Sequence, residues 1–243
     1  MELFYAQNLK ANDEILEFST EESRHLVKVL RKKPGDAVVV TNGNGLEWRG
    51  LISSLTTRSV LANRSDAVLH KNLHTPLHIA IAPTKSNDRL EWFLEKATEI
   101  GVTQITPIIC SHSERKTIKP ERMQKILVGA LKQSAQFFLP KLHSVVNFDQ
   151  FVQTQSATTK LLAHCHEGHK PALHQIKGLT KEVLIMIGPE GDFSEKEIKN
   201  AESNGFKSIT LGLRRLRTET AGMVALSKIN TLREMENTNQ RYI

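Results

Sequence analysis

Two stretches in the second half of the chain combine glycine with charged residues in a way that suits ligand chemistry. One is Gly-Pro-Glu-Gly at 188–191, directly after the apolar run at 183–187, and the other is LGLRRLRTETAG at 211–222. Glycine lets backbone N–H and C=O groups approach a flat ligand closely. Arginine offers positive charge and paired donors to a phosphate or a developing oxyanion. The two stretches predict a pocket for a flat ligand beside a cationic rim, although arginines in a loop can also serve only solvation.

Other ligand-binding signatures are weak. Neither GxGxxG nor GxxxxGK[ST] occurs, so a Rossmann or P-loop nucleotide site is poorly supported. The run HCHEGH at 164–169 groups three histidines with a cysteine and a glutamate, but His164 and His166 are expected on opposite faces of a strand. Because no second ligand cluster follows, we predict no metal site and interpret the run as a strand end near the same pocket.

Strands and helices alternate from about residue 74 onward, and they must position these stretches. The predicted strands lie at 77–83, 102–109, 158–165, 182–187 and 206–212. The predicted helices lie at about 90–100, from Pro120 towards Pro140, after capping boxes at Asp88/Glu91 and Ser194/Glu197, and at 219–235. This order predicts a parallel sheet with helices on both faces. Ligands gather at the carboxyl ends of such strands, where both glycine stretches fall.

The first 70 or so residues have a different pattern, which indicates a small β-rich, barrel-like domain. An Asn-Gly turn inside 36–53 predicts a hairpin, and another short strand follows near residue 60. The one helical piece would place His25, Leu26, Val29 and Leu30 on a single face before a Pro-Gly turn. Trp48 and Trp92 are expected in hydrophobic cores.

Composition favours an ordinary intracellular protein with a polyanionic partner. The 243 residues carry a formal net charge of +7. The run RHLVKVLRKK at 24–33 holds five cations and no acid, which suits phosphate contacts or merely a solvated face. No stretch resembles a membrane span or a signal peptide, and Cys110 and Cys165 show no CxxC spacing. We therefore predict a cytoplasmic protein.

Several motifs together carry a resemblance to a known family. IGPEGDFSEKEI at 187–198 and LGLRRLRTETA at 211–221 resemble the paired signature of the RsmE family of 16S ribosomal RNA uridine methyltransferases, of the SPOUT class. HLVKVLRKKPGD at 25–36 and DRLEWFLEKATEIGVTQITPI at 88–108 resemble further parts of that family. Ser113-Glu114-Arg115 and Gln133-Ser134 fall where the family has motifs, but Ala135-Gln136 stands where it usually has Gly-Arg, so that arginine's role would pass to Lys132 or Lys141.

The resemblance implies an α/β fold with two domains. Residues 1–72 would form a PUA-like RNA-binding β-barrel, and residues 73–243 a SPOUT methyltransferase domain with a deep trefoil knot. The protein would act as a homodimer and transfer a methyl group from S-adenosyl-L-methionine, without metal, to N3 of a specific uridine in 16S rRNA of the small ribosomal subunit. Alternatives are a SPOUT enzyme acting on tRNA or 23S rRNA, and a non-catalytic RNA-binding protein.

The same resemblance assigns roles to residues. Arg217 would stabilise the deprotonated uracil, with Glu219 as the candidate base or as the structural partner of an arginine. The predicted cofactor contacts are Gly188, Pro189, Glu190, Gly191, Leu211, Gly212, Leu213, Leu216, Thr218 and Thr220. The predicted RNA contacts are Arg24, Lys28, Arg31, Lys32, Arg214 and Arg215.

Overall fold

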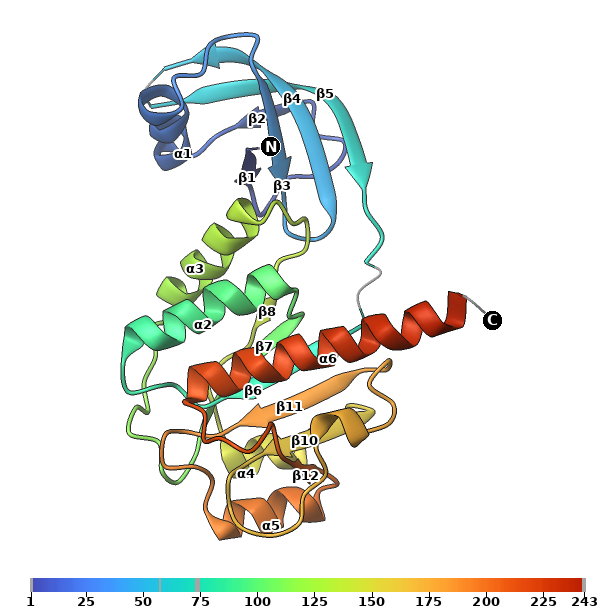
Figure 1. The fold of residues 1–243 in the computed structure, drawn as a ribbon. Helices are drawn as coiled ribbons and strands as arrows, with labels where there is room; N and C mark the ends of the chain where they lie inside the picture. Colours follow the sequence, from blue (N-terminus) through green and yellow to red (C-terminus); the bar gives the residue numbers. More distant parts are fainter. Residues whose placement is uncertain (1, 57, 73–74, 242–243) are drawn as a thin grey trace. The chain divides into compact units, whose positions relative to one another are not determined.

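The chain forms two compact units in the computed structural model, which describes residues 2–56, 58–72 and 75–241 (Figure 1). One unit comprises Met1–Leu73 with Val128–Leu139, and the other comprises His74–Leu127 with Pro140–Ile243. The second unit contains the predicted parallel sheet. The proposed division of the chain after residue 72 stays a prediction.

The sheet of the second unit is parallel throughout, with strand order β12-β10-β11-β6-β7-β8 and β9 also paired to β7. Its strands are β6 (Leu77–Ile81), β7 (Gln104–Ile109), β8 (Lys141–Leu142), β9 (Val146–Asn147), β10 (Thr159–Ala163), β11 (Val183–Ile187) and β12 (Lys207–Ile209). Every residue of the central strands β6 and β11 is buried, as expected for strands covered on both faces. The five strands predicted from apolar runs are confirmed.

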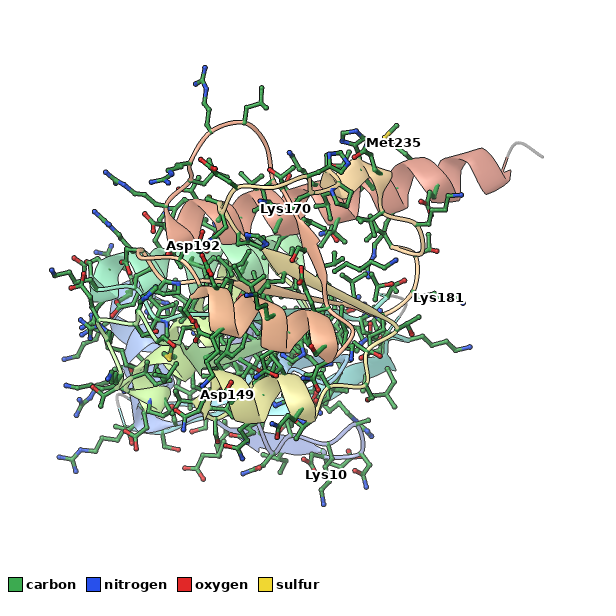
Figure 2. The ribbon with its side chains drawn as sticks, turned by 90° about the horizontal axis from the view of Figure 1, so that it is seen from below. Lys10, Asp149, Lys170, Lys181, Asp192 and Met235 are labelled. Atoms are coloured by element: carbon green, nitrogen blue, oxygen red, sulfur yellow. The ribbon has the colours of Figure 1, made fainter. Side chains whose placement is uncertain are left out.

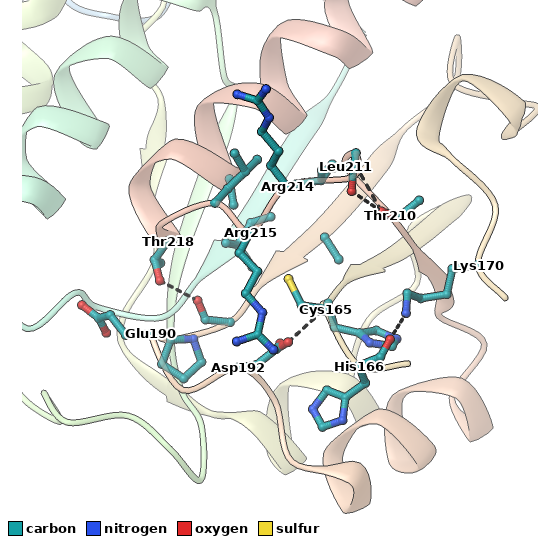
Figure 3. Close-up of a pocket in the computed structure, with 18 of the residues that line it drawn as sticks. Cys165, His166, Lys170, Glu190, Asp192, Thr210, Leu211, Arg214, Arg215 and Thr218 are labelled. Carbon is teal, nitrogen blue, oxygen red and sulfur yellow. Dashed lines mark hydrogen bonds between the residues drawn. The ribbon is translucent and has the colours of Figure 1, made fainter. Parts of the chain in front are cut away.

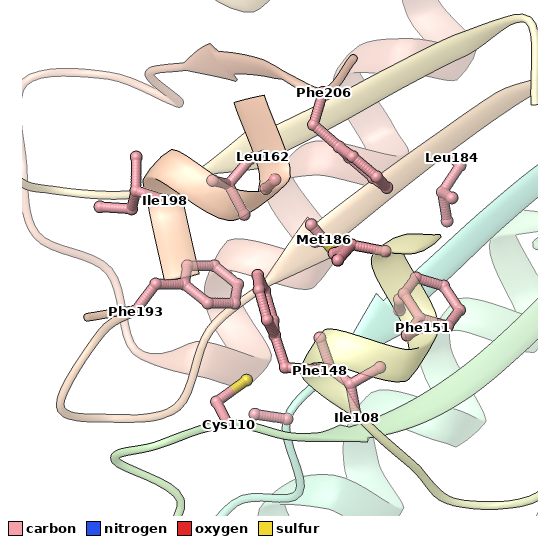
Figure 4. Close-up of a cluster of buried hydrophobic side chains, with 14 residues drawn as sticks. Ile108, Cys110, Phe148, Phe151, Leu162, Leu184, Met186, Phe193, Ile198 and Phe206 are labelled. Atoms are coloured by element: carbon pink, nitrogen blue, oxygen red, sulfur yellow. The ribbon is translucent and has the colours of Figure 1, made fainter. Parts of the chain in front are cut away.

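Helices cover both faces of this sheet (Figure 1). On one face lie α2 (Asn87–Ile100) and α6 (Thr218–Arg241), which pack against each other, and on the other lie α4 (Phe148–Gln153) and α5 (Glu195–Ser203). A 3₁₀ turn, η2, spans Leu173–Gln175. The second face holds a core in which Leu184 and Met186 of β11 meet Phe148 and Phe151 of α4 (Figure 4). Each fully buried side chain of this size stabilises the fold by roughly 1.5–3 kcal/mol.

The helix that follows the first glycine stretch starts as predicted. Ser194 accepts a hydrogen bond from the N–H of Glu197, and the Glu197 carboxylate accepts from the N–H of Ser194 at 2.8 Å. The same carboxylate accepts from the N–H of Ser111 at 2.8 Å, so it also fixes the loop after β7. The second predicted capping box is wrong, because the N-cap of α2 is Ser86, two residues before Asp88, and the Ser86 side chain makes no capping hydrogen bond.

Helix α6 is anchored by a buried arginine that sequence patterns do not reveal. The guanidinium of Arg233 donates to the carbonyls of Leu179, Thr75, Pro76 and Lys181 at 2.6–3.0 Å. These carbonyls precede β6 and β11, at the end of the sheet opposite their carboxyl termini. Figure 2 labels Lys181 and Met235 near this end, and Asp192 towards the other. Arg233 therefore joins α6 to the beginnings of two central strands.

A buried histidine of this unit, His78, has a lowered pKa. His78 of β6 is hydrogen-bonded to Thr106 at 2.7 Å, and its ring lies 5.3 Å from that of His143. Burial, with the charges of His143 and Lys141, lowers the pKa of His78 from its usual value of 6.5 to about 4. Folded protein therefore keeps this ring neutral at a pH where the unfolded chain protonates it.

We expect this histidine to reduce the free energy of unfolding as the pH falls from about 6.5 to about 4. In this range the unfolded chain binds a proton at this histidine and the folded state does not. The free energy of unfolding therefore falls by on the order of 2–3 kcal/mol over the whole interval. Urea unfolding of wild type and His78→Gln at several pH values measures this effect, as the difference between the two proteins in how their free energy of unfolding changes with pH. The same pH dependence in both proteins would contradict it.

The first unit contains a curled sheet with strand order β1-β3-β4-β5-β2. Its strands are β1 (Leu3–Tyr5), β2 (Ile15–Glu17), β3 (Ala37–Thr41), β4 (Leu46–Leu55) and β5 (Val60–Leu69). The predicted hairpin is the antiparallel pair β3–β4, and irregularities beside Gly50 and Ile52 bend β4 against β5. Trp48 is fully buried, as predicted, and its ring leaves no room for a Cβ atom at Gly50.

The predicted helix in the first unit is wrong in one respect. Helix α1 (Thr20–Arg24) continues as a π-helical turn, η1 (His25–Val29), with an i→i+5 bond from the N–H of Leu30 to the carbonyl of His25 at 3.0 Å. The wider turn shifts the phase of later side chains. Leu26 is buried as expected, whereas Val29 is 64% exposed. In the other unit, Trp92 is 46% exposed on α2, so its expected core position is also wrong.

Residues 128–139 belong to the first unit, although helix α3 (Pro120–Gln133) begins in the second. Leu139 donates to the carbonyl of Gly43, and Gly45 to that of Phe137, each at 2.8 Å. Lys132 forms an ion pair with Glu22, so this cation already has a structural partner. The helix ends earlier than predicted, before Ala135, which adopts a left-handed φ of 53°.

Neither a membrane span nor a disulfide is found in the described part of the chain. None of its helices is both long and apolar enough to cross a membrane. Cys110 and Cys165 are free thiols, the first buried and the second exposed.

Candidate functional site

A pocket of about 720 Å³ lies at the carboxyl ends of β10, β11 and β12, where the parallel sheet predicted a ligand site (Figure 3). Three segments form most of its wall: 163–167 after β10, 187–192 after β11, and 210–216 after β12. Lys170, Thr218 and Ala221 complete the lining. Both glycine stretches and the HCHEGH run thus meet at one pocket, as the sequence predicted.

The loop after β11 is held by groups from three distant segments. The Thr218 hydroxyl, at the start of α6, donates to the carbonyl of Gly188 at 3.0 Å. The Glu190 carboxylate accepts from the N–H of Lys85 at 3.0 Å, which supports a loop-holding role for this acid. His112 Nδ1, after β7, lies 3.0 Å from the carbonyl oxygens of both Gly191 and Asp192. The loop is therefore shaped before any ligand binds.

Close packing explains both glycines of this loop. A Cβ atom at Gly188 would lie 3.1 Å from the Phe193 ring, and one at Gly191 would lie 3.0 Å from Cβ of His112. Each contact is tighter than ordinary van der Waals packing, so a side chain would displace the loop. The glycines bring the backbone against its supports and leave its other side facing the pocket.

The loop after β12 is held by the side chain of its own Thr210 and by a lysine of α6. The Thr210 hydroxyl donates to the carbonyl of Gly212 at 2.9 Å and accepts from its N–H at 3.2 Å. Lys228 of α6 donates to the carbonyl of Leu211 at 2.6 Å. Gly212 has a φ of 146°, a conformation that residues with side chains rarely adopt. Leu213 is fully exposed at the tip of the loop.

Most of the predicted cofactor contacts line this pocket. The lining includes Gly188, Pro189, Glu190, Gly191, Leu211, Gly212, Leu213, Leu216 and Thr218, but not Thr220. Arg214 and Arg215, predicted as RNA contacts, also line it. In Figure 3 the side chain of Arg215 runs towards Asp192 and Cys165, whereas that of Arg214 points away from them. The role of each residue stays a prediction.

The two predicted catalytic residues lie just outside the pocket lining. Arg217 is exposed between Leu216 and Thr218, which do line it. Glu219 is buried, and its Oε1 lies 3.8 Å from Nε of Arg89 on α2. Among the described residues, Glu219 Oε2 finds no hydrogen-bond partner although it is buried. The cation nearest to Glu219 is thus Arg89 rather than Arg217.

Sequence reasoning missed Asp192 and Lys170 and misplaced two histidines. Asp192 is an acid next to a glycine, with no spacing that marks it, yet its carboxylate accepts from the N–H of Cys165 at 2.7 Å. The predicted opposite orientation of His164 and His166 is wrong, because residues two apart in a strand share a face; here the strand ends at residue 163 and the two rings lie 5.7 Å apart. Burial, then the charge of Lys170, lowers the pKa of His164. Within the described ranges no group of three or more His, Cys, Asp or Glu residues could hold a metal ion.

The predicted RNA contacts in the first unit are mostly free to meet a ligand. Arg24, Lys28 and Arg31 are exposed on α1 and the turns that follow it. Lys32 is partly engaged, because its Nζ lies 3.6 Å from the Glu2 carboxylate and 3.5 Å from the carbonyl of Ala37. Three of these four predicted contacts, Arg24, Lys28 and Arg31, are therefore accessible, and we call them the basic surface of the first unit.

Comparison with known proteins agrees with both units. A family model described as an RNA methyltransferase domain matches residues 71–230, and one described as an RNA methyltransferase PUA domain matches residues 18–63. A Synechocystis protein named ribosomal RNA small subunit methyltransferase E is 32% identical over 227 residues, which cover 89% of this chain and 73% of that protein.

Two crystal structures extend the likeness to the whole fold. One, from Porphyromonas gingivalis and described as a "probable rRNA-methyltransferase", has a TM-score of 0.90 and 35% identity, covering 97% of this chain and 100% of that one. The other, a ribosomal RNA small subunit methyltransferase E from Neisseria gonorrhoeae bound to S-adenosyl methionine, has a TM-score of 0.83 and 27% identity, covering 96% and 98%. The predicted PUA-like and α/β architecture is confirmed, while the knot stays a prediction. The chain belongs to the RNA methyltransferase family of ribosomal RNA small subunit methyltransferase E.

Proposed function

We propose that this protein transfers a methyl group from S-adenosyl-L-methionine to N3 of a specific uridine in 16S rRNA of the small ribosomal subunit. The observation that carries the proposal is the pocket between the loops 187–192 and 210–216, at the strand ends of an RNA methyltransferase domain. The relative from Neisseria gonorrhoeae, bound to S-adenosyl methionine, supports the same choice of cofactor.

The residues present fit such a cofactor. The pocket volume of about 720 Å³ lies within the range of roughly 300–1,000 Å³ usual for small-molecule sites. The two glycine-containing loops offer backbone donors and acceptors to a flat base, and the charged Asp192, Lys170 and Arg215 line the same pocket. When bound, the cofactor supplies an electrophilic methyl group.

The protein's own part in the reaction concerns the uracil. N3 carries a weakly acidic proton, which must leave before the nitrogen can act as a nucleophile, and the resulting charge spreads over O2 and O4. We propose that Arg217 meets this anion; its exposure and its position in the chain between two residues that line the pocket support this role. Glu219 would either take the proton or orient the neighbouring arginines, and its ion pair with Arg89 favours the second role.

Binding of the cofactor by the full chain tests the proposal directly. Titration calorimetry should give a saturable signal with S-adenosyl-L-methionine that survives EDTA. Gly212→Val should abolish or strongly weaken it, because a β-branched residue cannot hold a φ of 146° without strain and the loop would rearrange. Wild-type affinity in this variant would count against the pocket, and loss of binding or activity with EDTA against metal independence.

We also propose that the basic surface of the first unit contacts the phosphate backbone. Replacing Lys28 and Arg31 with alanine should weaken RNA binding and flatten its salt dependence by a slope of roughly 0.7–0.9 per lost contact. Binding to small-subunit RNA at several salt concentrations measures this. The exposed Lys10 and Lys71 provide a matched control pair with the same loss of charge. If both double variants changed the salt dependence of RNA binding by the same slope, the effect would come from the lost net charge and not from contacts of the basic surface.

Family resemblance supports two further proposals. We propose that the protein is a cytoplasmic homodimer, because its substrate would be the ribosomal small subunit and SPOUT pockets are completed at a subunit interface. Of the apolar residues Val224, Ile229 and Leu232 on α6, Ile229 is fully buried within its own unit, whereas Val224 and Leu232 are half-buried and remain available to a partner. A monomeric mass in light scattering, with full methyl transfer activity at the same protein concentration, would contradict the proposed dimer.

A further inference from the structure

Strands β10 and β11 separate where the pocket begins, and their backbone groups then need new partners. The last paired residues are Ala163 and Ile187. Beyond them the chain of β10 forms one wall of the pocket and that of β11 another. A pocket at the end of two neighbouring strands requires this separation, but separated strands no longer hold each other at a fixed distance. Something other than the hydrogen-bond ladder between β10 and β11 must therefore set the width of the pocket.

Two side-chain hydrogen bonds join the walls beyond the end of the ladder. Asp192 Oδ2 accepts from the N–H of Cys165 at 2.7 Å, a bond drawn in Figure 3. His166 Nε2 lies 2.6 Å from the carbonyl oxygen of Phe193, to which it donates. The other oxygen of Asp192 accepts from the N–H of Phe193 at 2.8 Å, which fixes the carboxylate itself. The side chain of Asp192 thus replaces the missing strand pairing.

The backbone of Asp192 adopts an uncommon conformation to do this. Its φ is 61°, and only two other non-glycine residues in the described part of the chain, Arg31 and Ala135, have positive φ. Glycine would adopt this conformation at lower cost, and strained residues at pocket walls often have a functional reason. The neighbours hold it there: Phe193 is completely buried, and His112 contacts the carbonyls of Gly191 and Asp192.

We propose that Asp192 is a positioning residue, whose carboxylate ties the 164–166 wall to the 188–193 wall and so sets the width at which the pocket binds its ligand. The inference rests on the proposed function only for the identity of that ligand. The tie itself is a property of the ligand-free protein. Its carboxylate accepts two N–H groups at once, a task that neither alanine nor glycine can perform and that the single amide oxygen of asparagine can perform only in part.

Three substitutions separate the carboxylate from the backbone. Asp192→Ala removes the carboxylate and keeps the unfavourable φ, whereas Asp192→Gly removes the carboxylate and relieves the backbone. Both should bind S-adenosyl-L-homocysteine about 10-fold more weakly than wild type in calorimetry, and by similar factors. Each loses the charged hydrogen bonds that hold the two walls at the distance at which the ligand binds. Asp192→Gly should nevertheless unfold at a higher temperature than Asp192→Ala. Asp192→Asn should lie between wild type and these two in affinity.

Affinity must be measured below the unfolding temperature of every variant, so that a merely structural role would leave it unchanged. Asp149→Asn is the matched control, because it neutralises an acid whose hydrogen bond, to Asn200, lies outside the pocket lining. Amide hydrogen exchange in the ligand-free protein is the second measurement. The N–H of Cys165 should exchange faster in the alanine and glycine variants and normally in the control.

The outcomes distinguish this inference from the proposed function. Wild-type affinity in both Asp192→Ala and Asp192→Gly would overturn the positioning role and leave the proposed function intact. Unchanged exchange at Cys165 in these variants would overturn the tie without reference to any ligand. A wild-type protein that binds neither S-adenosyl-L-homocysteine nor S-adenosyl-L-methionine would overturn the proposed function instead.

Discussion

Replacing Arg217 with alanine is expected to slow methyl transfer about 100- to 1,000-fold while affinities for cofactor and RNA change little. Loss of one preorganised donor to a developing anion typically has this effect. Arg217 is exposed beside the pocket lining, so its removal leaves no buried partner unsatisfied and the fold should be unaffected. Single-turnover methyl transfer on small ribosomal subunits measures the chemical step apart from binding.

The pH dependence sharpens this prediction. Arg217 would favour the deprotonated uracil, so the alanine variant should recover part of its rate as rising pH supplies that anion from solution. Arg217→Lys keeps the charge but loses the planar pair of donors, and it should fall between wild type and alanine. Arg58→Ala is the matched control, since it removes an exposed arginine for which no contact with cofactor or RNA is predicted. A near-normal rate for Arg217→Ala would end this mechanism.

The role of Glu219 can be decided with the same assay. If Glu219 acts only by orienting Arg217, the double alanine variant should be about as slow as the slower single variant. If it acts as an independent base, the two losses should add. Arg89 must be included in this comparison, because its Nε lies 3.8 Å from Oε1 of Glu219. Non-additivity with Arg89→Ala but not with Arg217→Ala would assign Glu219 to the contact between α6 and α2.

Replacing Arg233 with methionine is expected to lower the free energy of unfolding by about 3–4 kcal/mol. The guanidinium donates to four carbonyls, and an apolar side chain would remove these donors; of the four oxygens, that of Pro76 would keep the N–H of Val183 as a donor. Arg233→Lys keeps the charge, but a single ammonium cannot reach all four oxygens, so it should recover only part of the loss. Urea unfolding at pH 7.5 provides the measurement.

A control on charge is available within the same unit. Arg214→Met removes an exposed arginine and should change stability by no more than about 0.5 kcal/mol. Because the Arg233 contacts lie at the beginnings of the strands, away from the pocket, folded Arg233→Met should bind cofactor normally. A loss of stability no larger than that of Arg214→Met would show that the four hydrogen bonds contribute little.

The parts of the fold that depend on local pattern were predictable. The buried run at 183–187, the capping box at Ser194 and Glu197, and the hairpin around residue 43 all follow from short-range rules, and the structure contains each of them. The meeting of both glycine stretches at one pocket also follows, because parallel strands end at one edge. These features need no knowledge of the rest of the chain.

Other features depend on contacts between distant residues and could not be predicted. The π-helical turn that exposes Val29 breaks the 3.6-residue period on which its predicted position rested. Trp92 is 46% exposed on α2, and the side of a helix that is buried is decided by its tertiary contacts, which a single residue type does not reveal. Arg233 and Asp192 matter through carbonyl and amide groups far along the chain, and sequence patterns do not report such partners.

Base-resolved analysis of small-subunit RNA tests the central proposal most directly. Small ribosomal subunits from cells that lack this protein would be incubated with the purified chain and S-adenosyl-L-methionine carrying a labelled methyl group, and the 16S rRNA then digested for mass spectrometry. We predict label in a single N3-methyluridine. The label should be absent when the subunits are incubated without the protein, and lost when Arg217→Ala replaces the wild-type chain. Label on another base, on tRNA or 23S rRNA alone, or on no RNA at all would contradict the proposed function.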